Sequence, residues 1–230
     1  MSDLRFKIRA SQASKIVTLP KTKKARESGD LSGSHKNYIK EWLIEKKYRR
    51  TKDISSKFLD KGNMVEEASL TRVSLATGKF LTKDTENLEN EFATGHLDSR
   101  SNGVVYEIKS SWDIFTFPMF EQTLPNKDYY WQVQTYLWLT GYEVGYVCYC
   151  LENLPEPLIY DECKKLSWSR GMNGEIDEII ESEVRHKYTY DDIPNEDRIR
   201  MYRVDKNLED QELIKEQVKK SNVFIKEKIK

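Results

Sequence analysis

Two carboxylates and an ammonium group lie close together in one short stretch of the chain. Asp98 ends one segment, a Gly-containing turn and a β-branched stretch follow, and Glu107 and Lys109 come next with Ile108 between them. Side chains alternate faces along a strand, so Glu107 and Lys109 are expected on one side and Ile108 on the other. If residues 99–103 form a hairpin turn, Asp98 lies on the neighbouring strand close to Glu107. Hard oxygen ligands of this kind suit Mg²⁺ or Mn²⁺, and a lysine can stabilise developing negative charge.

The elements that must position these side chains can be predicted from periodicity and stop signals. A helix is expected from about Ser55 to Thr77, ended by Gly78. Its predicted apolar face consists of Phe58, Met64/Val65, Ala68 and Val73. The other predicted elements are a short helix at Ser11–Val17, a polar basic loop at 20–35, a helix at Asn37–Tyr48, strands near 90–98 and 103–110, a helix at Lys127–Thr140 closed by Gly141, a strand at Val144–Leu151, helical pieces around Glu175–Val184, a strand at Ile199–Val204 and a helix at Leu208–Ile229. This order predicts an α/β fold with a mixed central β-sheet flanked by helices.

Composition excludes several classes of protein. The 230 residues include no apolar run near the ~20 residues that a membrane span needs. The first residues lack the apolar region of a signal peptide, so a cytoplasmic location and no membrane partner are expected. Three cysteines argue against a disulfide framework, and Cys148 and Cys150 fall in a stretch typical of a buried strand. His35, His96 and His186 are too scattered to predict a zinc site.

Charge is zero overall but unevenly distributed. Residues 1–52 contain fifteen Lys or Arg and five Asp or Glu. Such a block can be no more than a solvated surface. Because Tyr38, Trp42 and Tyr48 are interleaved with the basic residues, a nucleic-acid contact surface is the favoured interpretation.

Four groups of residues, taken in order, resemble one enzyme family. They are Ile8-Arg-Ala-Ser11 near the start, Gly62 through Glu66 with the later Gly78, Asp98 followed by Glu107-Ile-Lys109, and Gln132-Val-Gln-Thr-Tyr136 on the next predicted helix. Together they resemble the PD-(D/E)XK nuclease superfamily, in particular its phage lambda-type (YqaJ-like) exonuclease branch. The resemblance covers roughly residues 5–150. It implies a restriction-endonuclease-like core and one nuclease domain over 1–230, with a basic DNA-contact segment at 1–52, a catalytic core at 53–152 and a helical elaboration at 153–230.

The resemblance also implies a role for each matched residue. Asp98, Glu107 and the backbone carbonyl of Ile108 would bind Mg²⁺, with Mn²⁺ as a substitute. Lys109 would orient the attacking water or stabilise the transition state. Glu66 would complete the acidic cluster, and the spacing from Gly62 favours it over Glu67, since adjacent helical residues point apart.

Further implied roles concern the helix after the catalytic strand and the substrate. Gln132 and Tyr136, four residues apart on one helix face, would position the lysine or contact DNA. Ser11 and Arg5 would bind a DNA phosphate. His96 would approach a substrate phosphate or serve only as a strand residue.

The function implied by the resemblance is a Mg²⁺-dependent DNA exonuclease of phage recombination. It would digest one strand from duplex ends in the 5′ to 3′ direction, work with a single-strand annealing protein and form a ring-shaped homotrimer. The alternatives are another endonuclease of the superfamily, a Cas4-like nuclease (disfavoured by the missing cysteine cluster), a catalytically silent DNA-binding module, and a protein-interaction domain with a basic arm.

Two aromatic stretches have no single interpretation from sequence. The cluster of Tyr129, Tyr130, Trp131 and Trp138 indicates core or a subunit interface. The stretch from Trp112 to Phe120 is unusually apolar for a loop after a catalytic strand, and it could be a DNA wedge, an oligomer contact or plain core.

Overall fold

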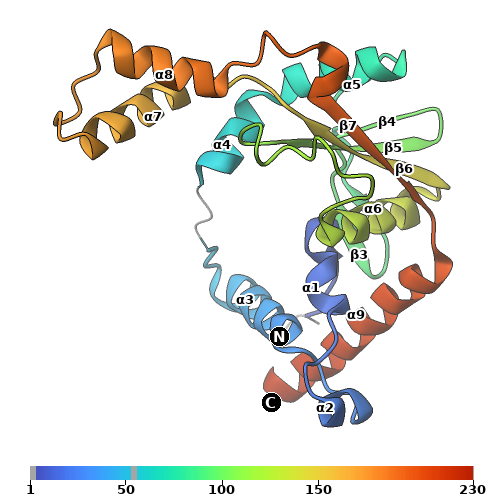
Figure 1. Ribbon diagram of the computed structural model, residues 1–230. Helices are drawn as coiled ribbons and strands as arrows, with labels where there is room; N and C mark the ends of the chain where they lie inside the picture. The colour runs from blue at the N-terminus through green and yellow to red at the C-terminus, as the bar shows by residue number, and fades with distance from the viewer. Residues whose placement is uncertain (1–3, 53–55, 230) are drawn as a thin grey trace.

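The computed structural model describes residues 4–52 and 56–229 (Figure 1). The elements are β1 (Ile8–Arg9), η1 (Ala10–Gln12), α1 (Ala13–Val17), α2 (Lys23–Glu27), α3 (Gly33–Tyr48), α4 (Lys57–Met64), α5 (Glu66–Thr77), β2 (Leu88–Glu89), β3 (Ala93–Gly95), β4 (Ser99–Ser101), β5 (Val104–Ser110), α6 (Lys127–Thr140), β6 (Val144–Cys150), α7 (Glu156–Ser169), α8 (Glu178–Tyr188), η2 (Asn195–Arg198), β7 (Ile199–Asp205) and α9 (Leu208–Ile229). The α7–α8 pair projects from one end of the molecule, and α1, α2, α3 and α9 gather at the other.

The strands form two mixed sheets, so the predicted α/β class with a mixed sheet flanked by helices is confirmed. The larger sheet has the order β4-β5-β6-β7, with β5 and β6 parallel and the other pairs antiparallel. The smaller sheet, β1-β3-β2, was not predicted as a separate sheet. The single strand expected near 90–98 is also wrong. The side chain of Asn90 accepts hydrogen bonds from the N–H groups of Phe92 and Ala93, which makes a turn there.

The hairpin before β5 is tighter than predicted. Asn102 and Gly103 alone form the turn, with φ of 50° and 75°. A two-residue turn with both central residues at positive φ matches the twist of paired strands and is favoured by Asn-Gly. Ser99 through Ser101 therefore belong to β4 rather than to the turn, and Ser99 pairs with Tyr106. Asp98 directly precedes this pair, which brings it beside Glu107.

The long helix predicted from about Ser55 to Thr77 is wrong in two respects. Ser55 lies outside the described residues, and the rest divides into α4 and α5 at Val65, whose φ and ψ of −107° and 10° leave the helical region. No Gly or Pro marks this position, so the sequence carries no signal for the break. The buried face also differs from the prediction: Lys61, Val65, Ser69 and Val73 are buried at a spacing of four residues, whereas Phe58, Met64 and Ala68 are exposed.

Most later elements are confirmed. The predicted helix at 127–140 is α6, closed by Gly141 at a φ of 75°. The predicted strands at 144–151 and 199–204 are β6 and β7, and the last helix is α9. Cys148 and Cys150 are buried in β6 as expected. The weakly patterned region 155–188 contains two full helices, α7 and α8.

The N-terminal region is more ordered and more buried than the sequence indicated. The polar basic loop predicted at 20–35 contains α2, whose first turn is capped by the side chain of Thr22. Tyr38 and Trp42 are core residues that contact Phe6 edge to face. Their interleaving with basic residues therefore reflects helical periodicity, and of the three aromatic residues only Tyr48 is exposed. The argument for nucleic-acid contact based on all three is wrong.

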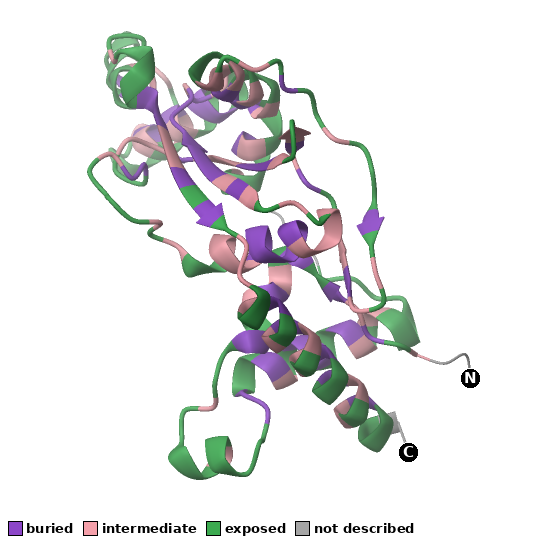
Figure 2. Cartoon of the chain, turned by 90° about the vertical axis from the view of Figure 1, so that its right-hand side faces the viewer, coloured by how far each residue is buried: buried purple, intermediate pink, exposed green. Residues whose placement is uncertain are grey.

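Helix α6 lies against the larger sheet and connects the two ends of the molecule. Buried residues gather along the long strands and the helices that cover them (Figure 2). A Cβ atom at Gly145 of β6 would stand 2.6 Å from Val133 of α6, so glycine allows the close approach of helix and strand. On its other side α6 contacts α1 and α9, and Ile214, Val218 and Ile225 of α9 are buried.

Within the described residues, no helix combines the length and apolar character needed to cross a membrane.

A buried lysine connects α4 to the ends of two strands. The side chain of Lys61 is almost fully buried, and its Nζ donates hydrogen bonds to the backbone carbonyls of Ser111, Trp112 and Glu152 at 2.7, 2.9 and 2.7 Å. Those carbonyls lie just beyond β5 and β6. All three N–H groups of the ammonium are thereby satisfied. Lys61 fixes α4 against the carboxyl ends of the two parallel strands.

We expect Lys61→Met to lower the free energy of unfolding by about 2–4 kcal/mol, because three buried carbonyls lose their donor. Urea denaturation measures this change. Lys165 on α7 is exposed and paired only with Glu162 at the surface, so Lys165→Met is the control and should cost less than about 0.5 kcal/mol. A Lys61→Met protein as stable as the control would show that the buried ammonium is not a structural link.

Candidate active site

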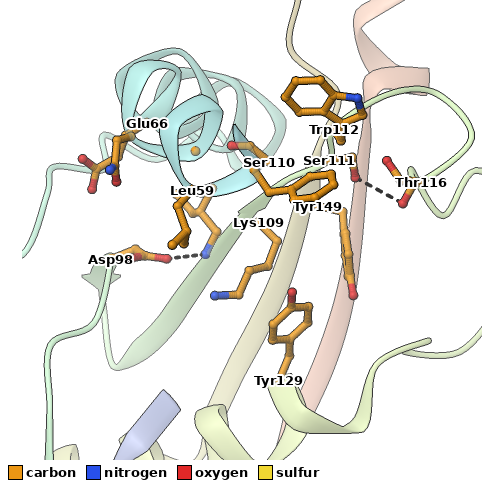
Figure 3. Close-up of a pocket in the computed structure, with 14 residues that line it drawn as sticks. Leu59, Glu66, Asp98, Lys109, Ser110, Ser111, Trp112, Thr116, Tyr129 and Tyr149 are labelled. Carbon is orange, nitrogen blue, oxygen red and sulfur yellow. Dashed lines mark hydrogen bonds between the residues drawn. The ribbon is translucent and has the colours of Figure 1, made fainter. Parts of the chain in front are cut away.

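Asp98 and Lys109 line a cavity near the carboxyl end of β5 (Figure 3), and Glu107, which is buried and does not line the cavity, is bonded to Lys109. Asp98 Oδ2 accepts a hydrogen bond from the backbone N–H of Ile108 at 2.6 Å. Lys109 Nζ donates to Glu107 Oε1. The same ammonium lies 4.7 Å from the ring centroid of Tyr129, which belongs to α6. The alternation of β5 and the Asn-Gly hairpin thus bring together the three groups that the sequence predicted.

Glu107 is buried to an unusual degree for a carboxylate. Its exposed fraction is 1%, and within residues 4–52 and 56–229 its Oε2 atom has no hydrogen-bond partner. Burial raises the pKa of Glu107 to about 7, against the opposing attraction of Lys109 and with a further increase from Asp98. An unpartnered buried carboxylate oxygen is costly unless a cation or donor joins it.

The two neighbouring charges respond to the same surroundings. Burial raises the pKa of Asp98, opposed by Lys109 and by the Ile108 N–H. For Lys109 burial acts to lower the pKa, but the carboxylates of Glu107 and Asp98 outweigh it and the pKa is raised. The two carboxylates therefore favour the charged form of Lys109.

The cavity has a volume of about 510 Å³. Its lining residues are Phe58, Leu59, Gly62, Asn63, Glu66, Asp98, Ile108, Lys109, Ser110, Ser111, Trp112, Thr116, Tyr129 and Tyr149. The lining combines the charged groups of Glu66, Asp98 and Lys109 with the apolar side chains of α4 and the aromatic ring of Tyr129 from α6 (Figure 3).

Glu66 rather than Glu67 lines the cavity, as the Gly62 spacing predicted. Its carboxylate, however, accepts a hydrogen bond from Lys83 at 2.6 Å and is not bonded to the other acids. In the described part of the chain, no group of three or more His, Cys, Asp or Glu side chains is arranged to hold a metal ion. The oxygen donors that stand together are therefore Asp98 and Glu107, with the neighbouring Ile108.

These donors fit a divalent cation by their chemistry. Mg²⁺ and Mn²⁺ bind through one or two carboxylates and keep several waters, so a three-acid cage is not required. The unpartnered Oε2 of Glu107 is the observation that favours a cation here. Glu66 also lines the cavity, and its Oε2 atom is bonded to Lys83.

Gln132 and Tyr136 are hydrogen-bonded to each other and to the backbone before Asp98, and among the described residues neither forms a hydrogen bond with Lys109. Gln132 Nε2 donates to the Tyr136 hydroxyl at 3.1 Å, and that hydroxyl donates to the backbone carbonyl of His96. A Cβ atom at Gly95 would stand 2.7 Å from the Tyr136 ring. The pair thus holds the segment that leads into Asp98. Both residues are buried and neither lines the cavity.

The three residues expected at a substrate phosphate do not reach the cavity either. Ser11 on η1 is exposed, and Arg5 is exposed and paired with Glu91. The side chain of His96 is exposed, and its backbone carbonyl accepts the Tyr136 hydrogen bond. None of the three belongs to the lining of the cavity.

Sequence reasoning missed several residues at the site. Tyr129 contacts Lys109 from α6, and the signal was present because Tyr129, Gln132 and Tyr136 share one helix face at spacings of three and four. Lys83 comes from the irregular segment after α5, and no local pattern marks its pairing with Glu66. Phe58, which lines the cavity, was assigned to the apolar face of a longer helix, and its neighbour Leu59, which also lines the cavity, was not singled out.

Comparison with solved structures shows similarity over nearly the whole chain. The crystal structure of a phage-related exonuclease from Haemophilus somnus 129PT shares 25% identity and a TM-score of 0.76, covering 97% of this chain and 96% of that one. An alkaline exonuclease from Laribacter hongkongensis has the same fold at 14% identity and a TM-score of 0.61, covering 97% and 93%. Its complex with dAMP gives 16% identity and a TM-score of 0.65, covering 97% and 89%. No family model matches the chain, and neither does any curated protein.

We expect Glu107→Gln to change how stability depends on pH. The pKa of Glu107 is higher in the folded chain, about 7, than its ordinary 4.5. The folded state then binds the extra proton, and the stability that this proton contributes is complete below about pH 4.5 and lost as the pH rises through about 7. As the pH rises from about 4.5 to about 7, the wild type should therefore lose roughly 1–3 kcal/mol of unfolding free energy relative to the Glu107→Gln variant.

Denaturation at both ends of this pH range measures the shift. The control is Glu67→Gln, which changes an exposed carboxyl that does not line the cavity. Its stability should depend on pH as that of the wild type does. A Glu107→Gln variant that parallels wild type across the range would show that the buried carboxyl is already ionised throughout.

Proposed function

We propose that this protein is a metal-dependent DNA exonuclease. The observation that carries the proposal is the convergence of Asp98, Glu107 and Lys109, with one buried carboxylate oxygen left unpartnered. The similarity to solved exonucleases over nearly the full length of both chains supports the same activity. The complex of one such structure with dAMP supports a nucleotide as the group that the site accepts.

The chain's own residues divide the work of phosphodiester hydrolysis. Asp98, Glu107 and the carbonyl of Ile108 would hold Mg²⁺, or Mn²⁺ in its place. A bound divalent ion supplies charge neutralisation at the phosphate and lowers the pKa of a water molecule. Lys109 places a fixed positive charge beside the scissile phosphate and stabilises the negative charge that develops there. Tyr129 restricts the position of that ammonium, and Tyr136 restricts the segment before Asp98.

The family resemblance extends this proposal. It adds digestion of one strand from duplex ends in the 5′ to 3′ direction, membership of the PD-(D/E)XK superfamily, a role in phage recombination with a single-strand annealing protein, and a homotrimer. It also adds action in the cytoplasm, and residues 1–52, 53–152 and 153–230 as the DNA-contact, catalytic and accessory parts of one nuclease domain.

We expect Lys109→Ala and Glu107→Gln to lower the rate of DNA cleavage by at least about 100-fold, because each removes a charge at the reacting phosphate. The assay compares end-labelled linear duplex with a covalently closed circle in the presence of Mg²⁺. Loss of the linear duplex alone indicates an exonuclease, and the position of the label gives its direction. Lys165→Ala, a change of an exposed lysine, should leave the rate unchanged.

Cleavage of the circle would instead indicate an endonuclease. Equal rates in wild type and Lys109→Ala would contradict the assigned site, and binding of DNA without any cleavage would favour a silent binding module.

We expect Mn²⁺ to raise the unfolding temperature of the wild type by about 3–8 °C at saturation, because a ligand that binds only the folded state stabilises it. Asp98→Asn and Glu107→Gln should reduce or abolish the increase. Glu89→Gln on β2, whose carboxylate is exposed, serves as the control. Thermal unfolding followed by circular dichroism measures this effect independently of activity, and equal increases in all four proteins would place the cation elsewhere.

A further inference from the structure

The last turn of α3 and the residues that follow it form an exposed, strongly basic surface. Residues 46–52 have the sequence Lys-Lys-Tyr-Arg-Arg-Thr-Lys, with five basic side chains and no acidic one. All seven residues are exposed. We refer to residues 44–52 as the α3 end. Such a density of positive charge on one short exposed segment is typical of a surface that binds a polyanion.

The nearby acidic residues of α3 are already engaged. Glu45 forms an ion pair with Arg9 at 2.5 Å, and Glu41 forms an ion pair with Lys52 at 3.3 Å. Within the described part of the chain, Lys46, Lys47, Arg49 and Arg50 form no ion pair. Their charge is therefore available to a ligand.

Exposed apolar groups lie among these charges. Tyr48 is 61% exposed and Ile44, four residues earlier on the same helix face, is 48% exposed. Lys47 Nζ lies 5.3 Å from the ring centroid of Tyr48. An aromatic ring flanked by cations offers a stacking surface for a base and contacts for its phosphates. In a duplex the bases are stacked inside, so this combination fits a single strand better than a double helix.

The backbone at the α3 end keeps an arginine where glycine is usually found. Arg49 ends α3 with φ of 53° and ψ of 40°, in the left-handed region. Glycine adopts this conformation without the cost that a side chain brings. The substitution Arg49→Gly is consequently compatible with the fold, which makes it a clean way to remove charge.

The α3 end is connected in sequence to the candidate active site. It leads toward α4, and Phe58 and Leu59 of that helix line the cavity (Figure 1).

We infer that the α3 end binds single-stranded DNA, with bases stacked on Tyr48 and phosphates held by Lys46, Lys47, Arg49 and Arg50. The inference rests on the proposed exonuclease function for the source of the strand, which is the one that digestion leaves behind. The surface itself acts by binding and takes no part in hydrolysis.

The test measures binding in the absence of divalent ions, so that no DNA is cleaved. Fluorescence anisotropy compares a labelled oligothymidylate with a duplex closed by hairpins at both ends. We expect Tyr48→Ala to weaken binding of the oligothymidylate by about 5-fold or more, with little change for the closed duplex. We expect the pair Arg49→Gly and Arg50→Gln to reduce the slope of log affinity against log salt by about 1.4 on the single strand.

Matched controls come from the opposite end of the molecule and from α9. Tyr160 on α7 is 55% exposed and also has a lysine Nζ, that of Lys164, 5.3 Å from its ring, so Tyr160→Ala controls for Tyr48→Ala. Lys226→Gln with Lys228→Gln removes two exposed charges of α9 and controls for the arginine pair. Both controls should bind the single strand as the wild type does.

Unchanged binding by Tyr48→Ala, or an equal loss on single strand and closed duplex, would overturn the inference. Cleavage is scored separately with Mg²⁺. A wild type that binds the single strand through Tyr48 but never cleaves DNA would overturn the proposed nuclease function and leave this binding surface in place.

Discussion

The burial of the Glu107 carboxylate within β5 is the constraint on which the arrangement of the site depends. An ionised carboxylate in the interior carries a desolvation cost of several kcal/mol unless a charge of opposite sign accompanies it. Strand geometry supplies that charge, because Lys109 is two residues further along and on the same face. Lys109 is positioned in turn by the ring of Tyr129 and the charge of Asp98. The sheet thus holds Asp98, Glu107 and Lys109 as one cluster, because burying any one of these charges without the others would cost free energy.

Helix α6 lies close enough to the strands for its side chains to contact the charged cluster. Two glycines stand where α6 meets the strands, Gly145 against Val133 and Gly95 against Tyr136. The helix can then present Tyr129 to the lysine while Tyr136 holds the carbonyl of His96. The same helix therefore positions both Lys109 and the segment that precedes Asp98. The Lys61 ammonium gives α4 a comparable attachment to the ends of β5 and β6.

Elements with a strong local signal were predictable from sequence, and contacts between distant segments were not. The helix α6, the strands β5, β6 and β7, and the helix α9 have clear periodicity and stop residues such as Gly141. The break at Val65 carries no Gly or Pro, and the strands β1, β2 and β3 are two or three residues long, too short for a periodic pattern. The meeting of Asp98, Glu107 and Lys109 was predictable because a hairpin brings them together locally. The pairing of Glu66 with Lys83 and the hydrogen bond from Tyr136 to His96 depend on tertiary packing, so spacing alone did not predict these partners.

The hydrogen bond from Ile108 to Asp98 divides the work of one carboxylate between its two oxygens. Oδ2 takes the place of a backbone acceptor at the end of the β4–β5 ladder. The electrostatic role falls to Oδ1. An asparagine that kept the bond to Ile108 would have to turn its amide oxygen toward the N–H and its NH₂ group toward the acids. Asp98→Asn would then keep the hydrogen bond that supports the hairpin while presenting a hydrogen-bond donor in place of an acceptor. The structural role of this residue and the polarity that it gives the site can therefore be changed separately.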